Sequence, residues 1–273
     1  MHKVSGIARA ATAAGFVAGA ALLLIAAPAR AQVVNFGSFG TGDVGAGANQ
    51  LTLNGNASVA GSALRVTPAG LNQAGSAFYN TKVSLLGGFT TQFDYDISGG
   101  NAADGFAFLI QDNGLNALGP TGGALGYDGL VRTLAVEFDT FGDIGLQVRT
   151  GTGSLSSLVV NPAVGVRGAR TARVVYTPGL LEVFLGTSSA TLPAVAQLSV
   201  AVNLSTTGVS DANGLSWVGF SSGTGAQTDN HDVKSWTLTS VNASAVPEPG
   251  SIALFLLGGA TAAGAMAARR RRA

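Results

Sequence analysis

Short runs of alternating apolar and polar side chains constrain the fold of this chain more than any other feature of its sequence. In the stretch FTTQFDYDI, residues 89–97, apolar, aromatic or β-branched residues mostly alternate with more polar ones. A period of two is typical of a half-buried β-strand. Further strands are expected at 33–39, 63–67, 75–79, 104–111, 134–140, 144–149, 171–177, 180–186, 196–202, 214–221 and 231–240.

Turn signals separate these runs. Thr177, Pro178 and Gly179 predict a hairpin turn between two of the expected strands. Glycine contributes 40 of the 273 residues but recurs at no fixed period, so the sequence shows no solenoid repeat. No segment between the two ends has helical spacing. Many short strands with turns between them predict an all-β sandwich.

Residues 1–31 are expected to be a signal peptide. Lys3 and Arg9 give a basic start, residues 10–27 form an apolar run, and Ala29-Arg30-Ala31 is a small-residue cleavage site before Gln32. The mature protein is therefore expected to be exported.

The other end has the pattern of a membrane anchor. Residues 242–250 form a linker, residues 251–268 carry no charge and are long enough to span a bilayer, and residues 269–273 are a basic tail. Arginines that follow a last hydrophobic segment are expected to remain in the cytoplasm, with the body of the protein on the other side. The alternative, a buried core helix with a basic tail, is less consistent with a run that no charge interrupts.

The linker contains the tripeptide Pro247-Glu248-Pro249, so a Pro-Glu-Pro, a short membrane helix and an arginine tail follow one another. This order resembles the PEP-CTERM sorting signal. The resemblance implies an envelope of Gram-negative type and transient anchoring in the inner membrane. It also implies cleavage near the motif by an exosortase-type membrane protease, and release to the cell surface or exopolysaccharide.

The charge of the chain changes when both ends are set aside. Between residues 32 and 246 there are 8 Lys and Arg against 13 Asp and Glu, so the net charge of +1 becomes −5. An acidic body with scattered basic residues predicts that nucleic acid is not a partner. Cysteine is absent, so no disulfide supports the fold. The body between residues 32 and 246 is long enough to bury the core of one large all-β domain.

Five motifs in this body occur in the order and at about the intervals found in one known family. They are GSAFYNTKVSL at 75–85, ADGFAFLIQ at 103–111, GGALGYDG at 122–129, LAVEFDTF at 134–141 and WVGFSSGTGAQTDNHDVKSWTLTS at 217–240. Together they resemble the legume-type (L-type) lectins. The resemblance implies a concanavalin-like jelly-roll sandwich of antiparallel sheets over residues 32–241. It also implies a sugar bound in a shallow depression of loops beside a calcium and a transition metal.

The same resemblance assigns carbohydrate-binding residues. Asp104, after Ala103, matches the aspartate that accepts hydrogen bonds from sugar hydroxyls, commonly next to a cis Ala-Asp peptide. Gly123 matches the glycine whose N–H donates to the sugar. The loop 223–230, which contains Gln227, corresponds to the variable loop that helps to set specificity. From residue type alone, Asp104 also fits a turn carboxylate that caps a strand.

The stretch LAVEFDTFGDIGLQV, residues 134–148, gathers three carboxylates and leaves three interpretations open. In a strand, Glu137 and Asp139 share one face while the apolar residues between them face the core. Catalysis is one interpretation, because a retaining glycosidase needs two carboxyl groups about 5–5.5 Å apart. Glucanases of the family-16 type, which have a related sandwich, place Glu, Asp and Glu on alternate residues, but Phe141 takes the third place here. The other two interpretations are a metal site and a pair of carboxylates on a solvated strand face.

For the metal site, the lectin resemblance assigns Glu137, Asp139, the carbonyl of Phe141 and Asp143 as ligands. Asp143 stands in the place of an asparagine that also contacts the sugar, and an ionised aspartate can only accept hydrogen bonds. The strand expected from 144 onward follows at once, so the family's metal loop is shortened and its histidine ligand is absent. Calcium prefers six to eight oxygens. Three alternatives remain open for this site: one bound calcium, no bound metal, and two bound ions.

These features predict an exported carbohydrate-binding protein that does not cleave its ligand. The first alternative is a structural matrix protein that has kept the sandwich and lost sugar binding. The second is a glycoside hydrolase of the same fold. Trp217 and Trp236 lie in apolar strand surroundings and are expected in the core rather than as sugar platforms.

Overall fold

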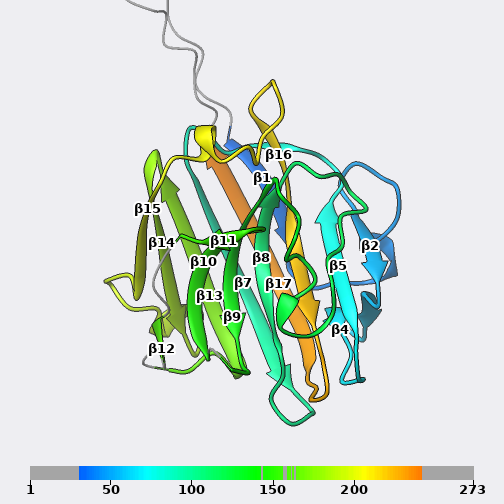
Figure 1. Ribbon diagram of the computed structural model, residues 1–273. Helices are drawn as coiled ribbons and strands as arrows, with labels where there is room; N and C mark the ends of the chain where they lie inside the picture. Colours follow the sequence, from blue (N-terminus) through cyan, green and yellow to red (C-terminus); the bar gives the residue numbers. More distant parts are fainter. Residues whose placement is uncertain (1–30, 143, 156–158, 161, 163, 242–273) are drawn as a thin grey trace, which may run out of the picture.

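The computed structural model describes residues 31–142, 144–155, 159–160, 162 and 164–241 as a sandwich of two β-sheets (Figure 1). The strands within each sheet pair antiparallel. This confirms the all-β jelly-roll sandwich expected from the sequence. The expected signal peptide lies outside the described residues except for Ala31, and the Pro-Glu-Pro linker, membrane helix and basic tail lie wholly outside them. Within the described part of the chain, no helix is long and apolar enough to cross a membrane.

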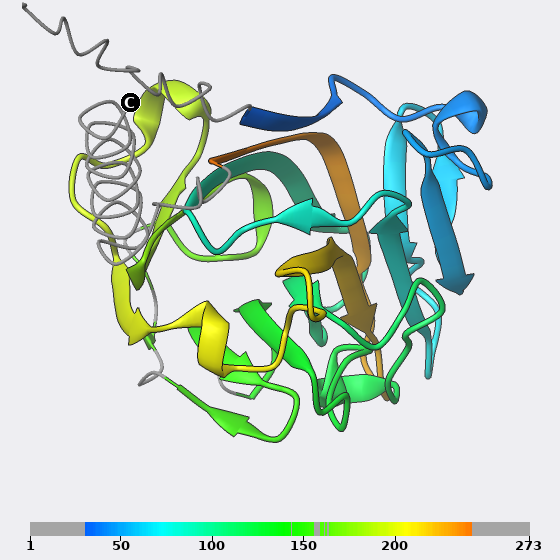
Figure 2. The same cartoon turned by 90° about the horizontal axis from the view of Figure 1, so that it is seen from above.

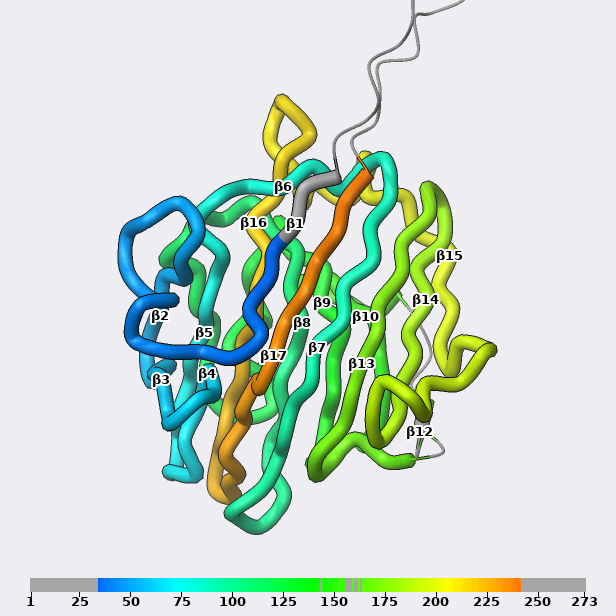
Figure 3. The backbone as a smooth tube through the Cα atoms, turned by 180° about the vertical axis from the view of Figure 1, so that it is seen from behind, coloured from blue at the N-terminus to red at the C-terminus, as the bar shows by residue number. Residues whose placement is uncertain are grey.

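The back sheet is most visible from behind (Figure 3). Its order is β15 (Leu198–Val202), β14 (Gly179–Gly186), β13 (Gly168–Thr177), β7 (Phe89–Ser98), β17 (Asn230–Val241), β4 (Ala63–Thr67) and β3 (Ser58–Ala60), and β1 (Ala31–Phe36) also pairs with β17. The strand β7 is the alternating run of the sequence, and its core-facing residues alternate with half-buried or exposed ones, as expected. The hairpin between β13 and β14 turns at Pro178, also as expected.

The front sheet carries the candidate site. Its order is β11 (Gly153–Ser154), β10 (Gly145–Thr150), β9 (Thr133–Asp139), β8 (Gly105–Gln111), β16 (Leu215–Gly223), β5 (Ala74–Tyr79) and β2 (Leu51–Gly55), with β12 (Val159–Val160) beside β10 and β6 (Val83–Ser84) beside β16. Short 3-10 turns lie in the connections, at η1 (Thr41–Asp43), η2 (Gly122–Ala124), η3 (Ser189–Thr191) and η4 (Leu204–Thr206). The view from above shows the loops after β8 against the outer side of this sheet (Figure 2).

Both faces of the front sheet are covered, which explains the composition of β8. All seven of its residues are buried. Phe106, Phe108 and Ile110 pack into the main core between the sheets. Ala107 and Leu109 belong to a second cluster, formed with Leu125 and Tyr127 of the loop that covers the outer face. A strand that is buried on both faces is continuously apolar, so β8 does not alternate as β7 does.

Aromatic side chains fill the main core. Trp236 is fully buried and packs edge-on against Phe220, with ring centroids 5.0 Å apart. Trp217 is half-buried beside the second cluster, with the ammonium of Lys82 5.4 Å from its ring centre. Trp236 therefore lies in the core, as the sequence predicted, whereas Trp217 packs at the edge of the second cluster.

Candidate functional site

Asp104 lies at the start of β8, where three segments meet. The Ala103–Asp104 peptide is cis. The N–H of Asp104 donates to the carbonyl of Gly223 at the end of β16, at 3.1 Å, and its carbonyl accepts from the N–H of Thr140, at 2.8 Å. The residue is only 5% exposed. Its backbone is therefore fixed between two neighbouring strands of the front sheet.

The carboxylate of Asp104 has an unused acceptor. Its Oδ2 is buried and has no hydrogen-bond partner among the described residues. Burial raises the pKa of this carboxyl, and the backbone N–H of Gly225 lowers it in part. A buried carboxylate oxygen without a donor is costly in free energy. A ligand that brings a hydroxyl or N–H group to Oδ2 would remove that cost.

Two glycine backbones surround this oxygen. A Cβ atom on Gly225 would stand 3.2 Å from Oδ2, and one on Gly122 would stand 4.0 Å from it. The two loops that carry these glycines also bond to each other, because the N–H of Gly122 donates to the carbonyl of Thr224 at 3.0 Å. A side chain on Gly223 is excluded, since its Cβ would lie 2.3 Å from the carbonyl oxygen of Gly122. Close approach of the two loops to Asp104 therefore depends on glycine at these positions.

Two of the other three predicted sugar contacts, Gly123 and Gln227, belong to the same loops. Gly123 follows Gly122 in η2, is exposed, and has open space where a Cβ would stand. Gln227 is half-buried, and its carbonyl accepts from the N–H of Gly225 at 3.2 Å. The structure thus places Gly122 and Gly225, the close chain neighbours of Gly123 and Gln227, directly against Asp104.

The loop before Asp104 is bonded to the loop between β16 and β17, and the two lie side by side at the lower end of the sandwich (Figure 1). Asn101 donates its N–H to the carbonyl of Thr228 at 2.7 Å and accepts the N–H of Thr228 on its side chain at 2.8 Å. Asp229, which is fully buried, accepts from the N–H of Gly100 and from the guanidinium of Arg167. The sequence motifs did not predict these supporting residues, because the partners lie far apart along the chain.

Glu137 is on the outer face of the front sheet, but it is not solvated. It is 3% exposed and accepts a hydrogen bond from the hydroxyl of Tyr127. Nη1 of Arg149 lies 3.5 Å from the same oxygen, Oε1. Burial raises the pKa of the Glu137 carboxyl, whereas Tyr127 and Arg149 lower it. The interpretation of a solvated carboxylate pair is therefore wrong for Glu137, because the loop after β8 covers it.

Asp139 and Phe141 lie at the end of β9. Oδ1 of Asp139 accepts the N–H of Phe141 at 2.8 Å, and Phe141 is 46% exposed. Asp139 pairs with Gly145 at the start of β10, so the connection between the strands is short, as the sequence predicted. Asp143 lies outside the described residues, and its assignment to metal and sugar stays a prediction.

The described residues do not fit a two-metal site. Among them, no group of three or more His, Asp or Glu side chains is arranged to hold a metal ion. Glu137, one of the predicted metal ligands, is already occupied by a tyrosine hydroxyl and a guanidinium. The other predicted calcium ligands among the described residues are Asp139 and the carbonyl of Phe141, fewer than the six to eight oxygens that calcium takes.

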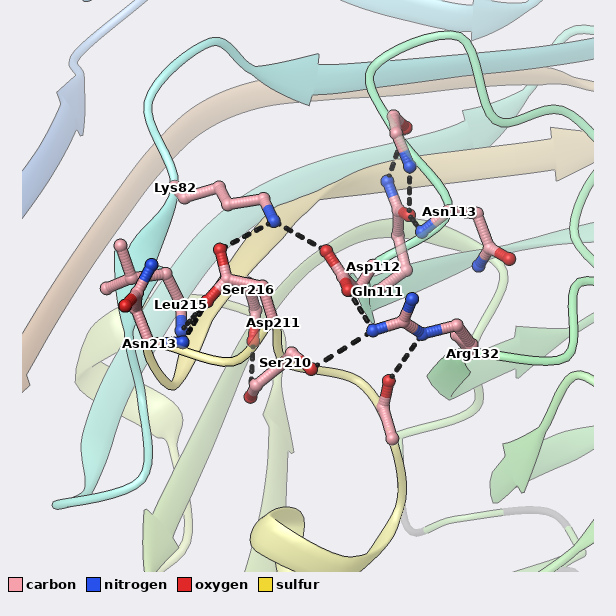
Figure 4. A network of polar contacts seen from close by, with 12 residues as sticks. Lys82, Gln111, Asp112, Asn113, Arg132, Ser210, Asp211, Asn213, Leu215 and Ser216 are labelled. Carbon is pink, nitrogen blue, oxygen red and sulfur yellow. Dashed lines mark hydrogen bonds and ion pairs between the residues drawn. The ribbon is translucent and has the colours of Figure 1, made fainter.

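A second polar cluster lies at the opposite end of β8 (Figure 4). Lys82 bridges Asp112 and Asp211, at 2.5 and 2.9 Å. Arg132 pairs with Asp112 and donates to the carbonyls of Gly208 and Ser210. Each charged group has a charged partner, so this cluster joins three loops and offers no unused acceptor of the kind found at Asp104.

Comparison with known proteins places the chain in a family. The model of the legume lectin domain matches residues 32–251. The chain belongs to the legume lectin domain family. A PEP-CTERM protein-sorting motif matches residues 245–272, which implies export and sorting to the cell surface. Both resemblances drawn from the sequence are thus confirmed.

Individual relatives agree with this assignment. Favin of Vicia faba is 31% identical over 210 residues, which is 65% of this chain and 84% of favin. The lectin of Bauhinia forficata, solved in complex with GalNAc, superposes with a TM-score of 0.62 at 24% identity, over 78% of this chain and 99% of its own. Arcelin-5, a lectin-like defense protein from Phaseolus vulgaris, gives a TM-score of 0.60 at 23% identity, over 77% of this chain and 97% of its own. At these identities the two structures support the fold alone.

Proposed function

We propose that this legume lectin domain binds a carbohydrate of the cell surface or extracellular matrix in the depression around Asp104, and that it does not cleave it. The observation that carries the proposal is the buried Oδ2 of Asp104, which has no donor among the described residues. Sugars present closely spaced hydroxyls that donate to such an oxygen. The two glycines beside this oxygen, Gly122 and Gly225, carry no side chain that would cover it further.

Family membership supports the same ligand class. Asp104, Gly123 and Gln227 lie on the loops to which the lectin resemblance assigns sugar contacts. The Bauhinia lectin was solved with GalNAc, which is a property of that protein. For this chain we propose the class, a carbohydrate, and leave the sugar to experiment.

The proposed route of the protein follows from its ends. Residues 1–31 would direct export, and residues 251–268 would hold the chain transiently in the inner membrane of a Gram-negative-type envelope. An exosortase-type protease would then cut near Pro247-Glu248-Pro249 and release the sandwich. The PEP-CTERM match over residues 245–272 supports this route.

The test is a glycan array probed with the purified full chain, displayed multivalently because single lectin sites bind weakly. The wild-type chain should bind a defined set of glycans. Asp104→Asn keeps the shape of the side chain but loses its charge, and we expect about a 10- to 100-fold loss of affinity. Glu182→Gln, a half-buried position on the back sheet, is the control and should bind as wild type. Equal binding by Asp104→Asn would contradict the proposed site.

The incomplete metal ligand set favours one second candidate, a matrix protein that keeps the sandwich without sugar binding. In that case the folded wild-type chain would bind no glycan on the array. A hydrolase is not favoured, because Glu137 is held by Tyr127 and Arg149 and the third of the alternate positions, where a second glutamate would stand, is Phe141. Release of reducing ends from β-glucans or galactans by the purified chain would overturn the non-catalytic proposal.

A further inference from the structure

An arginine lies against Glu137, one of the side chains that the lectin resemblance assigns to metal, on the outer face of the front sheet. We propose that the guanidinium of Arg149 replaces the metal ion, so that the candidate site is held in place by a cation of the chain itself and works without calcium or manganese. The glycan-binding part of this inference rests on the proposed function. Its structural part does not.

The register of β9 and β10 places the two side chains together. Gln147 pairs with Glu137 and Arg149 pairs with Ala135, so Glu137 and Arg149 are diagonal neighbours on one face. Nη1 of Arg149 is 3.5 Å from Oε1 of Glu137, and the two side chains are 28% and 4% exposed. Water therefore screens this pair less than it screens a surface ion pair.

The charge of Arg149 acts on more than one carboxylate. Glu137, Asp128 and Asp139 all stabilise its charged form. Two of these, Glu137 and Asp139, are the side chains that the lectin resemblance assigns to metal. A divalent cation at Glu137 would be repelled by the guanidinium and would compete with it for the same oxygen. The pair thus explains both why the buried glutamate is stable and why a metal is not needed there.

Glu137 also connects this cation to the sugar loop. Its partner Tyr127 belongs to the segment that follows η2, and the N–H of Tyr127 donates to the carbonyl of Ala124 at 3.0 Å. Gly122 and Gly123, on the loop beside Asp104, are therefore attached through Tyr127 to Glu137 and Arg149. On the other side, Asp139 pairs with Gly105, the residue after Asp104. Arg149 is a positioning residue that acts through both neighbours.

The first arm of the test measures thermal melting of the full chain in detergent, with chelator, with millimolar calcium and with millimolar manganese. An ion bound at about 100 times its Kd would raise the Tm by about 5–10 °C. We expect the three melting curves to agree within about 1 °C, far below the shift that a bound ion produces. A chelator-sensitive rise of several degrees in the wild-type chain would overturn the inference.

The second arm changes the pair itself. Arg149→Met leaves Glu137 buried without its cation, and we expect the Tm to fall by about 5–10 °C. The double variant Glu137→Gln with Arg149→Met removes both charges and should regain most of this loss. Arg149→Lys keeps a cation and should stay close to wild type. The single variant Glu137→Gln completes the comparison. If the Tm of the double variant falls by as much as the falls in Glu137→Gln and Arg149→Met added together, the two groups do not act as a pair and the inference fails.

The third arm measures glycan binding well below each Tm. Wild type and Arg149→Lys should bind equally with and without chelator, whereas Arg149→Met should bind at least several-fold more weakly, and the charge-free double variant should recover. Unchanged binding by Arg149→Met would overturn the positioning role. If the wild type binds no glycan, the proposed function fails, while the melting arms still decide whether Arg149 replaces a metal.

Discussion

Arg167 holds the buried carboxylate of Asp229 with two guanidinium nitrogens, Nε at 2.8 Å from Oδ2 and Nη2 at 3.1 Å from Oδ1. The same Nη2 donates to the carbonyl of Gly100, and the N–H of Gly100 donates to Asp229. The pair therefore closes a ring between the loop before Asp104 and the loop after β16. Such a ring positions the backbone groups of a binding site before a ligand arrives, which lowers the entropic cost of binding.

Replacement of this arginine should affect both stability and binding. In Arg167→Met, the fully buried Asp229 keeps the N–H of Gly100 but loses its counter-ion. Because the Arg167 side chain is 44% exposed, we expect the free energy of unfolding to fall by only about 1–2 kcal/mol. Glycan affinity should fall with it, since the loops lose their common anchor. Chemical denaturation and titration with the best array ligand measure the two effects.

The control for this prediction is Arg170→Met. The guanidinium of Arg170 donates to the carbonyls of Gly165 and Ala169 and holds no buried carboxylate. This variant should bind glycan as wild type does. Equal losses of affinity in the two variants would mean that the ring through Asp229 has no special role.

A single methyl group should close the ligand depression. Gly225→Ala is compatible with the backbone, because Gly225 is absent from the positive-φ positions, but its Cβ would stand 3.2 Å from Oδ2 of Asp104. We expect glycan affinity to fall about 10-fold or more while the Tm stays within about 2 °C, because the methyl group blocks an approach rather than a packed contact. Gly37→Ala, where no atom lies within 4 Å, is the control. Wild-type affinity in Gly225→Ala would show that the ligand does not approach Oδ2 past this loop.

For the cluster around Asp112 we predict that a substitution lowers stability and leaves glycan affinity unchanged. Asp112 neutralises both Lys82 and Arg132 (Figure 4). In Asp112→Asn the two cations face each other without it, and we expect a loss of about 2 kcal/mol of stability, seen as a Tm lower by roughly 5 °C. Asp112 follows the last residue of β8 and Asp104 precedes the first, so the strand separates them by roughly 26 Å. Glycan affinity below the Tm should not change, and a loss of affinity would contradict the separation of the two ends.

The sequence predicted the long strands and the main site residue for physical reasons. Alternation in β7 and the double-sided burial of β8 leave clear patterns, and both strands lie where they were expected. The strands β2 and β3 were missed, because β2 contains Asn54 and Gly55 and β3 has only three residues. Such short strands form because the rest of the sheet provides a partner, which a local pattern does not record.

The site was predictable to the same extent. Asp104 was proposed as a sugar-binding residue because it lies in a motif that stays together along the chain, and this role stays a prediction. The contacts of Glu137 with Tyr127 and Arg149 depend on strand register and on a loop folding over the sheet, so the sequence left Glu137 between catalysis, metal and solvent. Arg167 and Asp229 are 62 residues apart and carry no spacing signal. Sequence patterns therefore do not predict charged pairs that form only after the loops have packed.

The buried histidine makes the stability of the sandwich depend on pH. His231 is fully enclosed, and its Nδ1 lies 2.8 Å from Oγ1 of Thr67. Oγ1 of Thr67 contacts the hydroxyl of Ser222, and that hydroxyl donates to the carbonyl of Gly105. Since the Ser222 proton is directed to Gly105, Thr67 must donate to Ser222, and Nδ1–H of His231 must donate to Thr67. The unprotonated Nε2 is buried without a partner among the described residues.

Protonation of Nε2 would therefore place a charge and an unpaired N–H in the core, and burial lowers the pKa of His231 from 6.5 to about 4. The unfolded chain binds this proton near pH 6.5 and the folded chain near pH 4, so stability falls as the pH drops through that window. Between pH 7.5 and 5 the expected loss from His231 is about 2 kcal/mol. Above pH 7 the residue should contribute no pH dependence.

His231→Asn isolates this contribution, because the asparagine amide keeps a donor near Thr67 and does not titrate. Urea denaturation of both chains at pH 7.5 and pH 5 gives the comparison, since carboxylates elsewhere in the chain affect both equally. The loss of stability on acidification should be smaller in the variant by about 2 kcal/mol. Equal losses in the two chains would mean that His231 is protonated in the folded protein at pH 5, in conflict with a neutral imidazole at the end of the Thr67–Ser222–Gly105 chain.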